Sequence, residues 1–275
     1  MDTELSIIIF SKDRACQLDA LLRSIYLNVK IPYEVHIIYK ASNQVFECGY
    51  EGVWMAHPAD NIYWHVETDF KRNLDNLLGT IAAPYTVFMV DDMIVKREIA
   101  KDKIFLQLES PDVLGISLRL GRDIDADAIK KGVNVPMNSQ NLWRWKDCSI
   151  KGWNYPMSLD GTIFKTSDIQ CIKKLEYKKP NSLESAMSRK PLGNPLMVCY
   201  DKAKTVNLAI NRVQNEVKKN HCGDITEKFL NDKWLAGQQI CLKPLIIMKH
   251  NQRHIIVASL TFEDWHDCAP KNNTY

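Results

Sequence analysis

The sequence predicts an α/β fold in which a mostly parallel central sheet is flanked by helices, followed by a less regular second half. Three observations support this prediction. Short apolar runs, typical of buried strands, alternate with stretches of helical periodicity along the first 90 residues. Beyond residue 120 the alternation weakens. The chain has 275 residues, of which 45% are hydrophobic and 25% charged, which suits one large globular domain.

The first half contains four apolar runs that end at polar residues, as buried parallel strands do. They cover residues 5–10, 34–39, 61–66 and 85–90. Apolar residues recur at helical spacing over 18–29 and 70–81, and Ser11 or Asp13 is available to cap the first helix. A strand, a helix and a second strand within the first forty residues predict a right-handed unit with parallel strands.

The second half shows weaker patterns. We expect a helix over 99–108, a strand over 113–118, a polar, mobile flap up to Asn141 and a strand over 162–164. Asp224 and Glu227 suit a capping box at the start of a further helix. We therefore divide the chain into a regular half, 1–120, and a less regular half, 121–275, within one continuous domain.

Charge and composition exclude several classes of protein. The 36 basic and 33 acidic side chains give a net charge of +3, too balanced for general binding to nucleic acid. The eight cysteines form no Cys-x-x-Cys pair, so we expect reduced thiols. No apolar run approaches the roughly 18 residues that span a bilayer, and the N-terminus lacks the pattern of a signal peptide. We therefore expect a cytoplasmic protein.

Asp91 and Asp92 follow the apolar run at 85–90 directly. Ligands of open α/β sheets bind at the carboxyl ends of the strands, where this pair lies. Two adjacent carboxylates repel in a partly desolvated place unless a cation lies between them. Magnesium or manganese prefers such oxygen ligands and takes phosphate oxygens as further ones. The pair thus predicts a metal-bound nucleotide diphosphate, and the alternative is two aspartates that end a strand and cap a turn.

The run Val90-Asp91-Asp92-Met93 resembles the Asp-x-Asp region of GT-A glycosyltransferases. Residues 6–14, an apolar strand ending in Ser-Lys-Asp-Arg, are similar to the first strand and nucleotide loop of family 2 of these enzymes. The resemblance covers roughly the first 120 residues. It implies a GT-A fold, a nucleotide-sugar-binding half at 1–120 and an acceptor-side, catalytic half at 121–275. It also implies Asp92 as the ligand of Mn²⁺ or Mg²⁺, and Asp91 as its support at the donor sugar or ribose.

This resemblance implies a metal-dependent glycosyltransferase. It would move a sugar from a nucleoside-diphosphate sugar, with a UDP-sugar favoured, to a hydroxyl of a glycan or lipid-linked acceptor. Ser11 and Arg14 are predicted to contact the nucleotide, Arg14 through its fork of donors, although Arg14 would equally pair with Asp13. The family often has an acid after the second strand to hold uridine, and residues 39–42 read Tyr-Lys-Ala-Ser instead. Arg72 is a further candidate at the nucleotide, with a solvated helix face as its alternative.

An inverting transfer needs a group that removes the proton of the acceptor hydroxyl. Glu184, where family 2 proteins often carry their catalytic acid, and Asp160, beside an aromatic segment, are the candidates. Support of a helix N-terminus is the alternative for Glu184, and a turn is the alternative for Asp160. Some GT-A enzymes add a histidine to the metal, a role for which we prefer His250 over His254.

Two further groups of side chains suggest contacts with the acceptor. The aromatic group is predicted to stack on a sugar or to fill the core, and it comprises Trp143, Trp145, Trp153 and Tyr155. The basic group predicts a peripheral membrane contact or a solvated helix face, and it comprises Lys173, Lys174, Lys178, Lys179, Arg189 and Lys190.

Two rival functions stay open. A sugar nucleotidylyltransferase would share the sheet, but residues 10–17 lack its glycine-rich loop. A non-catalytic carbohydrate- or nucleotide-binding relative would keep the fold without turnover.

Overall fold

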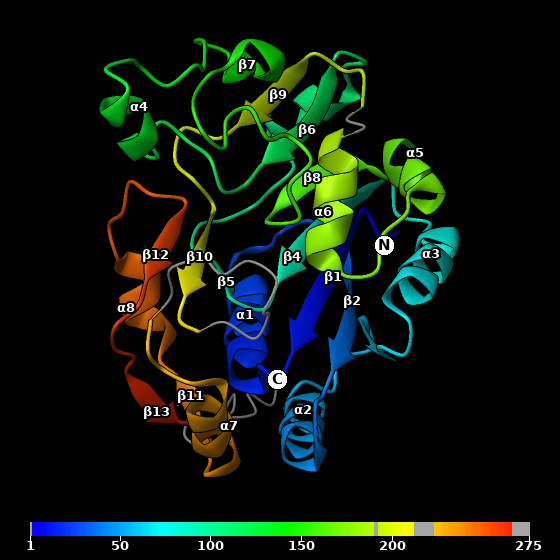
Figure 1. Ribbon diagram of the computed structural model, residues 1–275, viewed down its shortest axis with the longest axis vertical. Coiled ribbons are helices and arrows are strands. Elements are labelled where there is room, and N and C mark those ends of the chain that lie inside the picture. The colour runs from blue at the N-terminus through cyan, green and yellow to red at the C-terminus, as the bar shows by residue number, and fades with distance from the viewer. Residues whose placement is uncertain (1, 190–191, 212–222, 266–275) are drawn as a thin grey trace, which may run out of the picture.

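The computed structural model describes residues 2–189, 192–211 and 223–265, and all statements on structure concern these residues. An eight-stranded sheet forms the centre, in the order β3-β2-β1-β4-β8-β6-β9-β7 (Figure 1). The strands are β1 (Leu5–Lys12), β2 (Tyr33–Lys40), β3 (Ile62–Val66), β4 (Tyr85–Val90), β6 (Val113–Ser117), β7 (Leu142–Arg144), β8 (Thr162–Lys165) and β9 (Leu196–Cys199). Strands β1 to β4 are parallel, whereas β8 runs antiparallel to both β4 and β6. The predicted α/β fold is thus confirmed.

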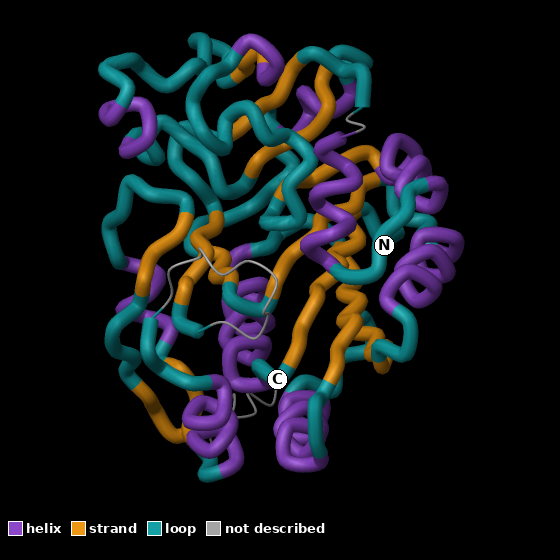
Figure 2. Tube along the Cα trace, viewed as in Figure 1, coloured by secondary structure: helices purple, strands orange, loops and turns teal. Residues whose placement is uncertain are grey.

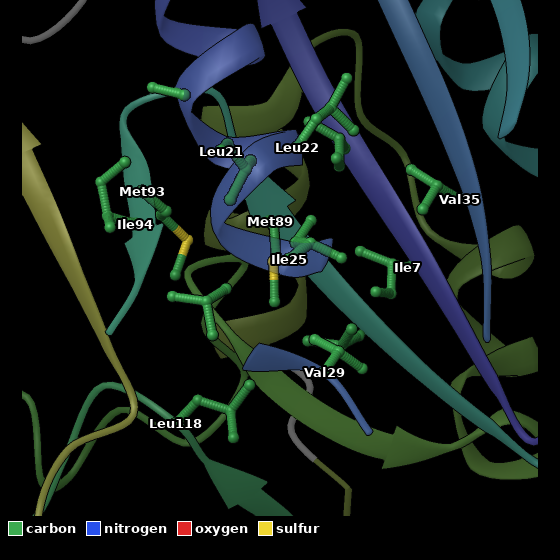
Figure 3. Close-up of a cluster of buried hydrophobic side chains, with 14 of the residues drawn as sticks. Ile7, Leu21, Leu22, Ile25, Val29, Val35, Met89, Met93, Ile94 and Leu118 are labelled. Atoms are coloured by element: carbon green, nitrogen blue, oxygen red, sulfur yellow. The ribbon is translucent and has the colours of Figure 1, made fainter. Parts of the chain in front are cut away.

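Strand β1 is buried along almost its whole length because helices cover both faces of the sheet. Ile7 and Ile9 of β1 pack in one core with α1 (Ala15–Asn28) and α2 (Gln44–Ala56). Ile8 faces the other core, which contains the buried face of α3 (Phe70–Thr80). Figure 3 shows the first of these cores, where Ile7 and Met89 lie beside Leu22 and Ile25 of α1. Alternate residues of one strand therefore fill two separate cores.

Helix α2 is an element that the periodicity did not indicate. Asn43 starts it, because its side-chain oxygen accepts hydrogen bonds from the backbone N–H groups of Val45 at 3.0 Å and Phe46 at 3.2 Å. Its buried residues are only Gly49, Tyr50 and Val53. Because this buried stripe is narrow and includes a glycine, the sequence of α2 shows little apolar periodicity.

Three local predictions are corrected by the structure. The predicted helix at 99–108 is only a short 3₁₀ turn, Phe105–Glu109, preceded by hydrogen bonds from two backbone N–H groups to the Asp102 side chain. The cap of α7 (Glu227–Leu235) is Thr226 rather than Asp224, because the Thr226 hydroxyl accepts from the Phe229 N–H at 3.1 Å. Helix α1 begins after Arg14 with no side-chain cap.

The predicted flap contains the short helix α4 (Ala126–Lys130), which is tied to the C-terminal part of the chain. Asn251 donates to the Asp125 carboxylate at 3.0 Å, and Arg253 donates to Asp127 at 3.2 Å. These bonds join the segment that contains Asn251 and Arg253 to the predicted flap.

The remaining helices and strands are short, and Figure 2 shows them together with the loops that connect them. They are β5 (Met93–Val95), β10 (Thr205–Ala209), β11 (Gln238–Ile240), β12 (His254–Ile256), β13 (Phe262–Asp264), α5 (Thr166–Ile169), α6 (Pro180–Arg189), α8 (Leu242–Ile247) and the 3₁₀ turns Trp145–Asp147 and Gln170–Lys174. Strands from both sides of residue 120 share the central sheet, and the division there stays a prediction. Across the described part of the chain, no helix has the length and apolar character needed to cross a bilayer.

Candidate active site

The site lies at the edge of the sheet where β1, β4 and β6 end. Because these strands are parallel, the residues at or just after their ends meet at one edge. They are Ser11 to Arg14, Asp91 with Asp92, and Arg119. Strand β8 runs the other way and begins there, with the Gly161 N–H donating to the Phe88 carbonyl at 2.8 Å. Asp160, which precedes Gly161, is therefore brought to the same edge.

Arg14 is buried between the two aspartates. Its Nη1 lies 2.8 Å from Asp91 Oδ1 and 3.4 Å from Asp92 Oδ2. Its Nε and Nη2 donate to the Asn211 side-chain and backbone oxygens at 2.8 and 2.7 Å. Burial disfavours the charged form of Arg14, but the charges of Asp91 and Asp92 outweigh it and raise the pKa. A cation of the protein itself thus lies beside the acidic pair.

Asp13, which the sequence offered as an alternative ion-pair partner of Arg14, contacts Ser42 instead. Its two carboxylate oxygens accept from the backbone N–H and the hydroxyl of Ser42, both at 2.6 Å. Asp13 adopts a left-handed backbone with φ 56°, which turns the chain from β1 into α1. The loop after β1 is therefore fastened to the loop after β2, where the sequence lacks the uridine-binding acid of the family.

Asp91 is fully engaged by neighbouring donors. Its Oδ2 accepts from the Ser11 hydroxyl at 2.9 Å and from the Lys12 N–H at 3.1 Å, and Oδ1 accepts from Arg14. The Ser11 hydroxyl also lies 2.7 Å from the hydroxyl of Tyr50 on α2. Ser11 thus holds Asp91 in place, and Asp91 in turn holds the Arg14 guanidinium.

Asp92 differs from its neighbour because one of its oxygens is unsatisfied. Among the described residues, its buried Oδ1 has no hydrogen-bond partner. Burial raises the pKa of Asp92 to about 7, with the charges of Asp91 and Asp160 adding to the rise, while Arg14 and the Asn207 side chain oppose it. The charge of Arg14 therefore offsets only part of the free-energy cost of burying the charged Asp92 carboxylate. An unsatisfied carboxylate oxygen beside a second acid fits a hard divalent cation.

A second cluster lies next to the first and contains both candidate bases. Arg119 donates through Nη1 to Asp160 and through Nη2 to the Ser158 hydroxyl at 3.0 Å. Glu184 Oε1 accepts from the Ser158 hydroxyl and from the Leu159 N–H, each at 3.1 Å. Helix α6 thus places Glu184 against the loop that carries Asp160.

Glu184 is a carboxyl group that titrates near neutrality. Burial raises its pKa to about 7, and the nearby charge of Asp160 adds to the rise, while Arg119 and the two hydrogen bonds oppose it. Asp160 acts electrostatically on both Glu184 and Asp92. The structure therefore places a carboxyl group with a pKa near neutrality beside Asp160, whose charge also acts on Asp92.

The histidines and Arg72 lie away from these two clusters or at their edge. His250 is placed among Lys96, Arg97 and Asp123. His254 Nε2 instead accepts a hydrogen bond from Arg119 Nη1 at 3.2 Å, and burial, followed by the Arg119 charge, lowers its pKa to about 4. Arg72 is exposed in the first turn of α3.

The three tryptophans of the aromatic group are not on the surface. Trp143, Trp145 and Trp153 are buried in the core, and the indole N–H groups of Trp143 and Trp145 donate to backbone carbonyls at 2.9 and 2.8 Å. Of the two alternatives, the core therefore holds for these three tryptophans, and of the four aromatic residues Tyr155 alone keeps partial exposure. Of the basic group, Lys190 lies outside the described residues.

Four polar residues of the site escaped the sequence analysis. Arg119 follows the predicted strand at 113–118, so the strand-end rule that indicated Asp91 would have found it. Tyr50, Asn207 and Asn211 lie in a helix, a strand and the loop after that strand, and they reach the site through packing. No motif or spacing marks these three residues.

Comparison with known proteins relates the chain to glycosyltransferases. No family model matches the chain. Over 190 residues it is 32% identical to the bifunctional glycosyltransferase pgtA of Dictyostelium discoideum, a match that covers 60% of this chain and 24% of that protein. The chain thus spans about a quarter of the length of this curated relative.

Two solved structures are similar in fold. Residues 1–349 of S. aureus TarS in complex with UDP superpose with a TM-score of 0.50 at 16% identity, over 74% of this chain and 60% of that one. The mannosyltransferase PcManGT from Pyrobaculum calidifontis, in complex with GDP-Man and Mn²⁺, gives 0.47 at 14% identity, over 72% and 55%. The chain has the GT-A fold of the glycosyltransferases and is related in sequence to one of them.

Proposed function

We propose that the protein is a metal-dependent glycosyltransferase. It would transfer a sugar from a nucleoside-diphosphate sugar to a hydroxyl of a glycan or lipid-linked acceptor. One observation carries the proposal: Asp92, with its unsatisfied oxygen, and Glu184, with a pKa near neutrality, are linked electrostatically through Asp160 at one edge of the sheet. A cation site would stabilise the leaving diphosphate and a general base would activate the acceptor hydroxyl, the two functions that a metal-dependent transfer uses.

The donor side is assigned to the first cluster. Asp92 would hold Mn²⁺ or Mg²⁺, which when bound stabilises the charge of a diphosphate leaving group. Asp91 and Ser11 hold Arg14 in place, and Arg14 adds a fixed positive charge at the diphosphate. Arg72 is proposed as an outer nucleotide contact. UDP stays the favoured nucleotide, and the role of His250 as a metal ligand stays a prediction that His250→Ala would test.

The acceptor side is assigned to the second cluster. Glu184 would remove the proton of the acceptor hydroxyl as its oxygen bonds to the anomeric carbon and the bond from that carbon to the diphosphate breaks. Asp160, held by Arg119, would bind sugar hydroxyls. Such a direct displacement inverts the anomeric centre. An α-linked product from an α-linked donor, detected by NMR, would refute inversion.

Turnover by the purified protein tests the proposal. We expect release of UDP from a UDP-sugar in the presence of Mn²⁺ and a glycan acceptor, and loss of this release in Asp92→Asn. Nucleotide binding without any release would favour the non-catalytic alternative. Formation of a UDP-sugar from UTP and a sugar phosphate would favour the nucleotidylyltransferase. A cytoplasmic location and a peripheral membrane contact stay predictions.

A further inference from the structure

Strand β10 fixes a buried amide beside the acidic pair. It runs antiparallel to β5, with Asn207 opposite Met93, and the Leu208 N–H donates to the backbone carbonyl of Asp92 at 2.7 Å. Because these backbone bonds leave little freedom, the Asn207 side chain has only its side-chain torsions with which to adjust.

The Asn207 side chain, like that of Asp92, has a buried oxygen without a hydrogen-bond partner in the described structure. Asn207 is only 3% exposed, and within the described ranges its Oδ1 has no hydrogen-bond partner. Asp92 Oδ1 is buried and unpartnered too, and the Asn207 side chain lies close enough to stabilise the charge of Asp92. Two acceptor oxygens cannot satisfy each other. Both need a donor or a cation, since an unsatisfied buried polar atom costs about 1–3 kcal/mol.

We propose that Asn207 is a second protein ligand of the divalent metal, alongside Asp92. The proposal rests on the metal-dependent function proposed above. A carboxylate with an amide oxygen is a suitable donor pair for Mn²⁺ or Mg²⁺, whose other positions are filled by water and phosphate oxygens. Rotation of the amide about its last torsion turns either Nδ2 or Oδ1 toward Asp92. Without metal, Nδ2 would donate to the carboxylate, and with metal bound, Oδ1 would coordinate the ion.

Other nearby groups are less suited to this role. Arg14 is a cation, and Asp91 already accepts three hydrogen bonds. His250 lies among Lys96, Arg97 and Asp123. Asn207 is therefore a neutral oxygen donor placed by the sheet itself beside Asp92. The competing explanation is a buried water bonded to both oxygens.

Binding of Mn²⁺ together with UDP, followed by electron paramagnetic resonance, tests the assignment. Asn207→Leu keeps the volume and removes the oxygen, and we expect it to weaken Mn²⁺ binding by at least about tenfold. Asn207→Asp restores a donor and should bind Mn²⁺ at least as tightly as the wild type. Asn231→Leu is the matched control, because Asn231 is also buried with an unpartnered Oδ1 but lies on α7.

A spectroscopic signature separates coordination from a structural role. In Asn207→His, the ring nitrogen should produce a directly coordinated ¹⁴N coupling on Mn²⁺, and Asn231→His should produce none. Wild-type affinity in Asn207→Leu, or no nitrogen coupling in a folded Asn207→His, would overturn the proposal and favour the water. If Asp92→Asn alone weakens Mn²⁺ binding, only this inference fails. If the wild type binds no Mn²⁺ with UDP, the metal-dependent function fails with it.

Discussion

Three acidic side chains of the site differ in their hydrogen-bond partners and in their burial. Asp91 accepts from Ser11, Lys12 and Arg14, so its charge is satisfied by the protein. Asp92 keeps one oxygen without a partner in the described structure. Glu184 is buried enough to hold its proton up to about pH 7. Environment rather than residue type thus distinguishes Asp91, the proposed cation ligand Asp92 and the proposed base Glu184.

Glu184→Gln tests the assignment of the base. The amide fills the same space and cannot take a proton, so we expect kcat to fall by about 10² to 10⁴-fold with donor affinity unchanged. The wild-type rate should rise with pH through about 7, because the base acts in its deprotonated form. Steady-state kinetics over a pH series measure both effects. Asp160→Asn is the comparison, and a larger loss of kcat there, with Glu184→Gln active, would move the role to Asp160.

At the level of elements, continuous apolar runs were the reliable signal. The four strands of the first half and helices α1 and α3 are confirmed. Most of them bury a long apolar run or a broad stripe, whereas in β3 only Ile62 is buried. Helix α2 has a narrow buried face, and a helix predicted near residue 100 is only a 3₁₀ turn. Here local hydrogen bonds of Asn43 and Asp102 decide the backbone, and hydrophobic periodicity does not record them.

The start of α7 offers a test at this scale. Thr226→Ala removes the oxygen that accepts from the Phe229 N–H, so it should lower the free energy of unfolding by about 1 kcal/mol. Asp224→Ala, the cap that the sequence favoured, should change it by less than about half of that. Urea denaturation of both variants decides the matter. A larger effect of Asp224→Ala would restore the capping box.

At the scale of the whole molecule, the site is assembled from segments far apart in the sequence. Arg14, Asp91 and Asp160 converge because strands end or begin at a common edge, and this part was predictable from strand order. The hydrogen bonds from Arg14 to Asn211 and the approach of Asn207 to Asp92 depend on how β10 packs against β5. Long-range packing of this kind has no signature in a single sequence.

The raised pKa of Glu184 also predicts a dependence of stability on pH. The folded protein holds the Glu184 proton up to about pH 7, whereas the unfolded chain releases it near 4.5. The folded state thus binds more protons in this window, and the wild type loses stability as pH rises through it. Relative to the wild type, Glu184→Gln should gain up to about 3 kcal/mol between pH 4.5 and 8. Urea denaturation across this range measures the difference, and a constant difference would contradict the burial assigned to Glu184.

Calorimetric titration of UDP, and of GDP for comparison, with and without Mn²⁺, tests the central claim most directly. The donor diphosphate is assigned to a cation held by Asp92, so binding should require Mn²⁺ and should be lost in Asp92→Asn, with the unfolding transition of the variant intact. The preference between UDP and GDP would name the base. Failure of the wild type to bind either nucleotide, or binding that ignores both Mn²⁺ and Asp92→Asn, would contradict the account.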